Sequence, residues 1–346
     1  MTKGAAEGLL FCTNVLIPSL FPFMVLASFI VKCGASDKLS FFLAPITTKL
    51  FKLPACAGMS ILLSLIGGYP VGARGIMSLW EEKKITVLQA KRMSMFMVGG
   101  GPAFIIFVVG DSLLKERTLG VILWISGICA QLILAFILAA IAKTKKPEKE
   151  KSCNTKALPV STALVQSCAD GVQGLLSMCG LVVLFSAMFG ILNNIGADKL
   201  VEEALLFFCA DKAAATSVFS VLWEVTKGCS VACKNGAPIF LTAFAIGWGG
   251  VCVHFQVYAV VERLGISKLK FTLCRLAQGI LTAIFASICL MVYTPTQQMY
   301  SNINFAQAEI SAKTYMGSAA LIVMSILFLI TVKLPAKTQV VTGNRK

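Results

Sequence analysis

Charged residues are scarce in this chain. Asp, Glu, Lys and Arg make up 14% of its 346 positions, whereas hydrophobic residues make up 57%. A soluble domain carries roughly a quarter charged residues, so the composition excludes a soluble globular protein. The uncharged runs are 8–31, 53–73, 93–110, 118–142, 171–197, 235–261, 276–308 and 314–332. Most exceed the ~20 residues that cross a hydrocarbon core, which predicts an all-α polytopic protein, multi-pass in the cell inner (cytoplasmic) membrane.

Signatures of catalysis and metal binding are also scarce. The chain has one His, and no two of its 13 cysteines stand three positions apart as in a CxxC motif. Cys229 and Cys233 lie one helical turn apart, but most cysteines fall inside apolar runs, where a thiol behaves as a small hydrophobe. Neither a nucleophile with its base nor a phosphate-binding or dinucleotide-binding motif is present. We therefore expect no enzyme activity, no metal site and no cofactor.

Acidic residues are about half as frequent as basic ones, 16 against 31, which gives a net charge of +15. The excess is clustered: six lysines lie within 143–156 and four basic residues within 333–346. Basic clusters beside membrane spans mark cytoplasmic loops and attract anionic lipid. We therefore predict a cytoplasmic C-terminus, anionic lipid bound at the cytoplasmic face and no nucleic-acid partner. The N-terminus lacks the pattern of a cleaved signal peptide.

The two halves of the chain resemble each other. Residues 30–39 match 192–200, residues 60–75 fall opposite 221–236, and the Gly-rich stretch 98–101 pairs with 246–250. Three matches in the same order predict an internal duplication. We divide the chain into a first repeat (1–142), a basic cytoplasmic linker (143–159), a second repeat (160–293), and a segment with an external loop, a final membrane helix and a basic tail (294–346).

The distribution of basic residues predicts how the repeats sit in the membrane. If both basic clusters are cytoplasmic, segment 213–236 must be a re-entrant hairpin rather than a full span. Segment 53–75 then dips in from the cytoplasm, and the long spans 8–31 and 169–195 point in opposite directions. This arrangement is an inverted-topology repeat, which many secondary transporters share. A capping box at 86–89 predicts a short basic helix at the cytoplasmic interface, with no counterpart in the second half.

Two Gly-rich motifs interrupt the first repeat. In the motif 67–75, glycines and Pro70 must stop the helix, so Gly68 and Tyr69 are expected at a hairpin tip whose free amides, with Arg74, face an anionic substrate. The alternative is a cytoplasmic loop in which Arg74 is an ordinary positive-inside residue. Three glycines followed by Pro102 predict a second helix break at 99–102.

Polar residues interrupt the second repeat at Glu224, where a carboxylate near mid-membrane is costly and therefore indicates function. Thr226 lies two residues away. In the alternative interpretation Lys227 neutralises Glu224. Farther along, Gly249 and Gly250 loosen a helix just before His254 and Gln256. The imidazole is either a proton relay or solute ligand or a hydrogen-bonding contact between helices.

These motifs together resemble the YlbJ-type sporulation integral membrane proteins, which carry the gate domain shared with concentrative nucleoside transporters and the FeoB iron transporter. The resemblance covers nearly the whole chain. It rests on Ile17-Pro18-Ser19-Leu20-Phe21-Pro22-Phe23, Gly67-Gly68-Tyr69-Pro70-Val71-Gly72-Ala73-Arg74, Gly101-Pro102-Ala103-Phe104-Ile105, Glu224-x-Thr226-x-Gly228 and Gly249-Gly250-x-x-Val253-His254-x-Gln256.

The resemblance implies a role in spore formation and two gate-type repeats that transport a small solute, anionic or nucleoside-like. The expected solute-binding residues are Gly68, Tyr69, Pro70, Arg74, Gly101, Pro102, Glu224, Thr226, Gly249, Gly250, His254 and Gln256. The alternative is a non-transporting membrane scaffold for spore coat or cortex assembly. This alternative is favoured by departures from the family, because Met97, Val98 and Cys252 stand where the family has polar residues. We also expect a homo-oligomer.

Overall fold

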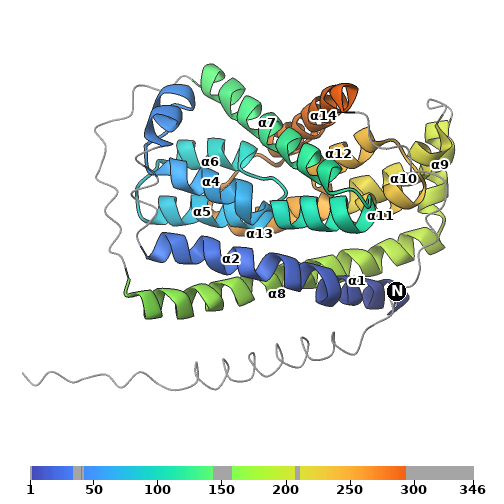
Figure 1. Cartoon of the computed structure of the whole chain (residues 1–346), viewed down its shortest axis with the longest axis horizontal. Helices are drawn as coiled ribbons and strands as arrows, with labels where there is room; N and C mark the ends of the chain where they lie inside the picture. Colours follow the sequence, from blue (N-terminus) through green and yellow to red (C-terminus); the bar gives the residue numbers. More distant parts are fainter. Residues whose placement is uncertain (1, 34–39, 41–42, 143–157, 207–210, 294–346) are drawn as a thin grey trace, which may run out of the picture. The chain divides into compact units, whose positions relative to one another are not determined.

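The computed structural model describes residues 2–33, 40, 43–142, 158–206 and 211–293, which form helices and no strand (Figure 1). The all-α prediction is therefore confirmed. The elements are α1 (Thr2–Phe11), η1 (Cys12–Leu16), α2 (Ile17–Lys32), η2 (Ile46–Leu50), α4 (Ala57–Gly67), α5 (Tyr69–Glu81), α6 (Val87–Phe96), η3 (Ala103–Leu113), α7 (Arg117–Ile141), α8 (Val160–Asn194), α9 (Ala197–Leu206), α10 (Lys212–Trp223), α11 (Val225–Lys234), α12 (Ile239–Trp248), α13 (Gly250–Val261), η4 (Glu262–Leu264) and α14 (Lys268–Val292).

Long apolar helices establish a polytopic membrane protein. Within the described residues, four segments are long and apolar enough to cross a membrane: α7, α8, the stretch from α12 to η4, and α14. The helical stretches 2–16 and 20–32, bent by 57° at the break between them, are together apolar enough to form either a fifth, broken span or a re-entrant loop. The predicted span over 93–110 is not one helix, because α6 ends at Phe96 and η3 begins at Ala103. The predicted final span, 314–332, lies outside the described residues.

The opening helices of the two halves run antiparallel along each other. The start of α1 lies against the end of α8, where a Cβ added to Gly190 would lie 3.7 Å from the Gly4 Cα. At the opposite end, the Ser28 hydroxyl donates to the Asp170 carboxylate over 2.9 Å. In Figure 1, α1 and α2 lie beside α8 along this length. The two helices therefore point in opposite directions, as predicted; their orientation relative to the membrane stays a prediction.

Each half contains a helical hairpin. Helices α4 and α5, of 11 and 13 residues, turn at Gly68, and α10 and α11, of 12 and 10 residues, turn at Glu224. Their arms pack antiparallel: Gly75 lies beside Ser60, and Asn235 Nδ2 donates to the Thr216 hydroxyl over 3.1 Å. At 1.5 Å per residue each arm is at most about 20 Å long, short of the ~30 Å hydrocarbon core. No single arm can therefore cross a membrane.

A broken helix follows each hairpin. In the first half, α6 and η3 are separated by the non-helical stretch 97–101; in the second, Gly249 adopts a left-handed backbone (φ +82°) between α12 and α13. The capping box at Thr86 and Gln89 does open α6. The prediction that α6 has no counterpart is wrong, because α6 is the first arm of a broken segment, in the position that α12 holds in the second half. Its location at the membrane interface stays a prediction.

The two halves interlock through the second arms of their hairpins. Helix α5 of the first half packs on α13 of the second, and α11 of the second packs on η3 of the first. The long helices α7 and α14 pack on each other. Both hairpin tips and both helix breaks consequently meet in the interior of the described unit (Figure 1).

Candidate functional site

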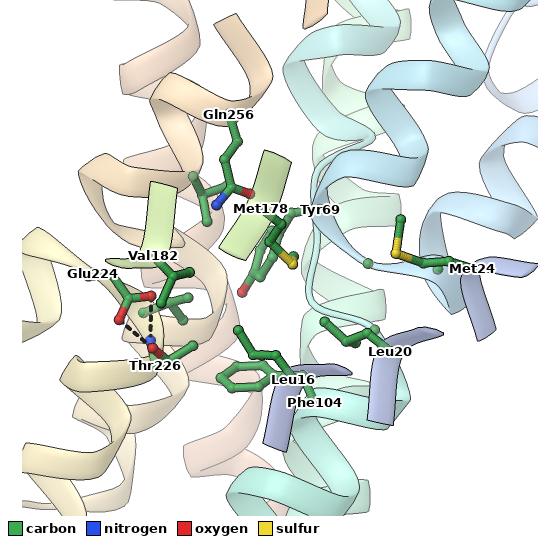
Figure 2. Close-up of a pocket in the computed structure, with 15 residues that line it drawn as sticks. Leu16, Leu20, Met24, Tyr69, Phe104, Met178, Val182, Glu224, Thr226 and Gln256 are labelled. Carbon is green, nitrogen blue, oxygen red and sulfur yellow. Dashed lines mark hydrogen bonds between the residues drawn. The ribbon is translucent and has the colours of Figure 1, made fainter. Parts of the chain in front are cut away.

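A small cavity of about 30 Å³ lies between the two hairpin tips (Figure 2). Its volume suits about two water molecules. Most of its wall is apolar, and the polar side chains come from the tips and from α13. The lining residues are Leu16, Leu20, Met24, Gly67, Gly68, Tyr69, Gly101, Phe104, Met178, Val182, Glu224, Val225, Thr226, Val253 and Gln256. Six of the twelve predicted residues are among them: Gly68, Tyr69, Gly101, Glu224, Thr226 and Gln256.

The first hairpin tip packs directly on the first helix break. Gly68 has φ +82°, which glycine adopts without strain, and a Cβ there would lie 3.3 Å from the Gly101 amide nitrogen. A Cβ on Gly101 would lie 2.7 Å from the Ile66 carbonyl oxygen. Tyr69 then crosses to the second half, where its hydroxyl donates to the Ile246 carbonyl over 2.8 Å. The tip therefore packs by its backbone on the first break and is tied by the Tyr69 side chain to α12, just before the second break.

The second hairpin tip is built around the Glu224 carboxylate. Its backbone is extended, and its side chain is 2% exposed and accepts hydrogen bonds from the amides of Thr226 (3.0 Å) and Lys227 (2.8 Å). The Thr226 hydroxyl also donates to it. Glu224 thus caps the N-terminus of α11, where the helix dipole favours negative charge. The Lys227 ammonium forms its ion pair with Glu7 of α1 at 2.8 Å rather than with Glu224.

The second tip also packs on the second helix break. Gly250 has φ +73°, and a Cβ there would lie 2.8 Å from the Glu224 Cα. In addition, Trp248 Nε1 donates to the Leu222 carbonyl over 3.1 Å. Each half therefore brings its hairpin tip against a glycine of its own broken helix, Gly101 in the first and Gly250 in the second.

The polar atoms of the cavity are mainly hydrogen-bond acceptors. Gln256 Oε1 is buried and has no hydrogen-bond partner among the described residues. The Tyr69 hydroxyl uses its proton on Ile246, and the Glu224 carboxylate carries negative charge when ionised. Figure 2 shows Tyr69 and Gln256 directed toward the space beside Glu224. Such a lining favours a group that donates hydrogen bonds, or a cation.

A fully buried arginine, which the sequence analysis missed, joins the two helix breaks. Arg275 of α14 donates to the Val98 carbonyl at the end of α6 and to the Gly247 and Trp248 carbonyls at the end of α12. Gln278 Oε1 accepts from it over 2.6 Å. The arginine satisfies carbonyls left free where the helices stop, which a buried backbone requires. Its sequence signal was weak, because Arg275 follows two lysines and resembles the basic flank of a span.

The six remaining predicted residues do not line the cavity. His254 packs between Trp248 and Phe271, with ring centroids 4.4 and 5.3 Å away, and its Nδ1 lies 2.8 Å from the Gly250 carbonyl. Its Nε2 is buried without a hydrogen-bond partner in the described part of the chain. Pro70 and Pro102 begin helices, and Gly249 and Gly250 form the break behind Glu224.

Arg74 lies elsewhere. It sits within α5 rather than at the tip, and it lines a separate pocket of about 310 Å³ between α2, α5 and α8. Its guanidinium therefore contributes no positive charge to the inner cavity. Among the described residues, no three His, Cys, Asp or Glu side chains gather as a metal site.

Comparison with known proteins finds a relative whose name states a role. Over 333 aligned residues the chain is 22% identical to a protein of Bacillus subtilis (strain 168) named "Sporulation integral membrane protein YlbJ", covering 87% of this chain and 82% of the relative. No protein-family model matches the chain, and no solved structure matches it. The similarity supports the resemblance to YlbJ-type proteins and agrees with a multi-pass membrane protein.

Proposed function

We propose that this chain transports a small solute across the cytoplasmic membrane during sporulation, with the inner cavity as the solute site. The observation that carries the proposal is the meeting of two hairpin tips and two broken helices around a cavity that holds a buried carboxylate. Irregular backbone at membrane depth occurs where it is buried in protein or lines a cavity. Paired interruptions in two halves of a chain are typical of transporter binding sites. The sporulation role comes from the similarity to YlbJ.

The size of the cavity requires the hairpins to move. About 30 Å³ is far below the 300–1,000 Å³ of ordinary ligand pockets, so the conformation described is too closed to hold a solute of ordinary size. The contacts at Gly101 and Gly250 hold each tip by backbone packing and few hydrogen bonds. In our proposal these contacts separate when a solute enters, and each hairpin moves as a unit because neither arm spans the membrane.

The lining of the cavity narrows the solute class. Glu224 and Gln256 offer acceptors, and Arg74 is absent from the wall. The proposed solute therefore presents N–H or O–H donors or a positive charge to the tips, as a nucleoside-like molecule does through its amino and hydroxyl groups. An anionic group would meet the Glu224 carboxylate without a compensating cation.

The alternative function is a membrane scaffold for spore coat or cortex assembly. The observation that favours it is that Glu224 already has three hydrogen-bond donors from its own hairpin, so capping alone accounts for the carboxylate. Under this alternative the cavity is a packing imperfection, and no solute passes through it.

Replacing the carboxylate separates these functions. Glu224→Gln keeps the shape and one acceptor of the cap but removes the charge from the cavity. Asp211→Asn is the matched control, because Asp211 caps α10 of the same hairpin through the amides of Ala213 and Ala214, at the end away from the cavity. Both variants would replace the natural gene in the sporulating host, with protein abundance measured by immunoblot and function by the yield of heat-resistant spores.

We expect Glu224→Gln to abolish sporulation at near-normal abundance and Asp211→Asn to leave it intact. A metabolite comparison of wild-type and variant cells, taken at the same time after the onset of sporulation, would then name the solute that is not transported. Normal spore yield from Glu224→Gln at normal abundance would exclude the transport proposal and favour the scaffold.

A further inference from the structure

A second pocket, which we call the outer pocket, lies between α2, the α4–α5 hairpin and α8. Its volume is about 310 Å³, and its polar residues are Ser28, Lys32, Arg74, Ser78 and Asp170. This volume falls in the range of ordinary small-molecule sites. Met24 lines both this pocket and the inner cavity, so the two are neighbours separated by one side chain.

The outer pocket contains more positive than negative side chains. Lys32 and Asp170 form an ion pair at 2.7 Å, and Ser28 donates to the same carboxylate over 2.9 Å. Arg74 has no ion-pair partner among the described residues; its Nη1 donates to the backbone carbonyl of Asp170 over a long 3.3 Å. Two cations against one carboxylate leave a formal charge of +1, and the unmatched cation is a guanidinium.

The pocket lies toward the ends of α2 and α8 that adjoin the basic linker. Lys32 ends α2, and its carbonyl accepts a hydrogen bond from the Leu158 amide, two residues after the last lysine of the basic segment 143–156. Asp170 lies ten residues into α8, a helix of 35 residues that exceeds the ~20 needed to cross a bilayer. The pocket is therefore at the same end of the helices as the basic linker.

We propose that the outer pocket binds the phosphate or carboxylate group of an anionic ligand, with Arg74 as its main contact. A guanidinium presents paired N–H donors that match two oxygens of such a group, and it forms stronger hydrogen bonds to an anion than to a neutral carbonyl. In the proposed complex Lys32 exchanges Asp170 for the ligand. The hydroxyls of Ser28 and Ser78 donate to the carboxylates of Asp170 and Glu82 in this structure, so they would have to leave these partners to bind the anion. This site is independent of the transport proposal, because it requires no movement through the inner cavity.

Two sources can supply such a group: a soluble phosphate or an anionic lipid headgroup. The full chain, purified in detergent, would be titrated with inorganic phosphate and with glycerol 3-phosphate, with binding measured by thermophoresis. In a second arm, nanodiscs containing phosphatidylglycerol and nanodiscs of pure phosphatidylcholine would be compared by native mass spectrometry for lipid retained on the protein.

The variants are Arg74→Gln, Arg74→Lys and Lys32→Gln, with Arg117→Gln as the matched control. Arg117 is an exposed arginine paired with Asp111, outside both pockets. We expect Arg74→Gln to weaken binding roughly tenfold or more, as loss of a charged hydrogen bond does, and Arg74→Lys to weaken it less. Lys32→Gln leaves the negative charge of Asp170 without its ion-pair partner and should also weaken anion binding. This variant tests the proposal if Arg74→Gln fails to accumulate in the membrane. Arg117→Gln should bind as the wild type.

Each outcome decides the proposal. Arg74-dependent binding of phosphate or glycerol 3-phosphate supports a soluble ligand, and Arg74-dependent retention of phosphatidylglycerol over phosphatidylcholine supports a lipid headgroup. The proposal is overturned if none of the probes binds, or if the Arg74 and Lys32 variants bind as tightly as Arg117→Gln. Normal spore yield from Glu224→Gln would leave this result untouched, so the two proposals fail separately.

Discussion

Arg275 is the side chain on which the closed arrangement of the two halves depends most. It is completely buried and holds the carbonyls at the ends of α6 and α12 together. Substitution by Met would leave these carbonyls and Gln278 without their donor, and a buried polar group without a partner costs about 1–3 kcal/mol each. We expect Arg275→Met to lower the free energy of unfolding of the detergent-purified protein by about 3–5 kcal/mol. Its unfolding temperature and its abundance in the membrane should fall accordingly.

The control for Arg275 is Arg263→Gln. Arg263 forms an exposed ion pair with Glu81, and pairs of this kind contribute about 0–1 kcal/mol. Differential scanning fluorimetry would compare the two variants with the wild type. Equal, small shifts in both unfolding temperatures would show that the carbonyls do not rely on Arg275.

His254 is expected to matter for packing rather than for solute binding. It lies outside the cavity wall and is surrounded by Trp248, Tyr258 and Phe271. His254→Phe keeps an aromatic ring of similar size and removes a buried nitrogen that has no partner among the described residues. We expect sporulation and abundance near the wild-type level in His254→Phe, and lower abundance in His254→Ala, which leaves a cavity. Loss of sporulation from His254→Phe at normal abundance would restore a functional role for the imidazole.

At the scale of helices, the glycines of the two breaks are required by close backbone contact. Gly250 combines φ +73° with a Cβ position 2.8 Å from the Glu224 Cα, so alanine there would strain the backbone and displace the second tip. We expect Gly250→Ala to destabilise the protein by about 2–4 kcal/mol. Thermal unfolding in detergent would measure the change.

Gly127 is the matched control for Gly250. It lies in the middle of α7, and a Cβ added there would meet no atom within 4 Å. Alanine in a helix interior is favoured over glycine by roughly 0.5–1 kcal/mol, so Gly127→Ala should be neutral or slightly stabilising. If Gly250→Ala proved as stable as Gly127→Ala, the tip would not pack on the break as described.

The hairpins also show how far a Gly-rich motif can be interpreted from sequence. The motif 67–75 predicted a helix stop, and α4 does end at Gly67. Only Gly68 leaves the helix, however, because Pro70 is tolerated in the first turn of α5. Gly72 and Gly75 lie inside α5, close to Met97 and Ser60, and allow tight packing. Arg74 is consequently carried along α5 to the outer pocket, away from the tip.

At the scale of the whole molecule, the predicted topology places 143–159 and the C-terminus in the cytoplasm. Single cysteines at Glu150, Asn304 and Asn344, in a cysteine-free background, would be tested with a membrane-impermeant thiol reagent on intact cells. We expect labelling at position 304 alone, because both basic clusters stay inside. Labelling at 150 or 344, or none at 304, would contradict the re-entrant assignment of 213–236. All three positions lie outside the described residues.

Sequence alone determined the properties that depend on local composition. The long uncharged runs required membrane-spanning helices, the matching segments 60–75 and 221–236 located both hairpins, and the Gly-rich stretches located both helix breaks. These features follow from hydrophobicity and backbone preference within a few residues, so a linear pattern contains them. Glu224 was identified in the same way, as a charge in an apolar region.

Tertiary structure alone decided which of these residues meet. Arg74 and Glu224 were predicted to share one site, yet one faces the outer pocket and the other the inner cavity, because the rotation of α5 about its axis and the packing of α8 direct each side chain. Arg275 became visible as the link between the breaks only once α6, α12 and α14 were placed together. Contacts between residues far apart in the chain, such as Arg275 with Val98, 177 positions away, depend on the packing of whole helices, which no local pattern in the chain specifies.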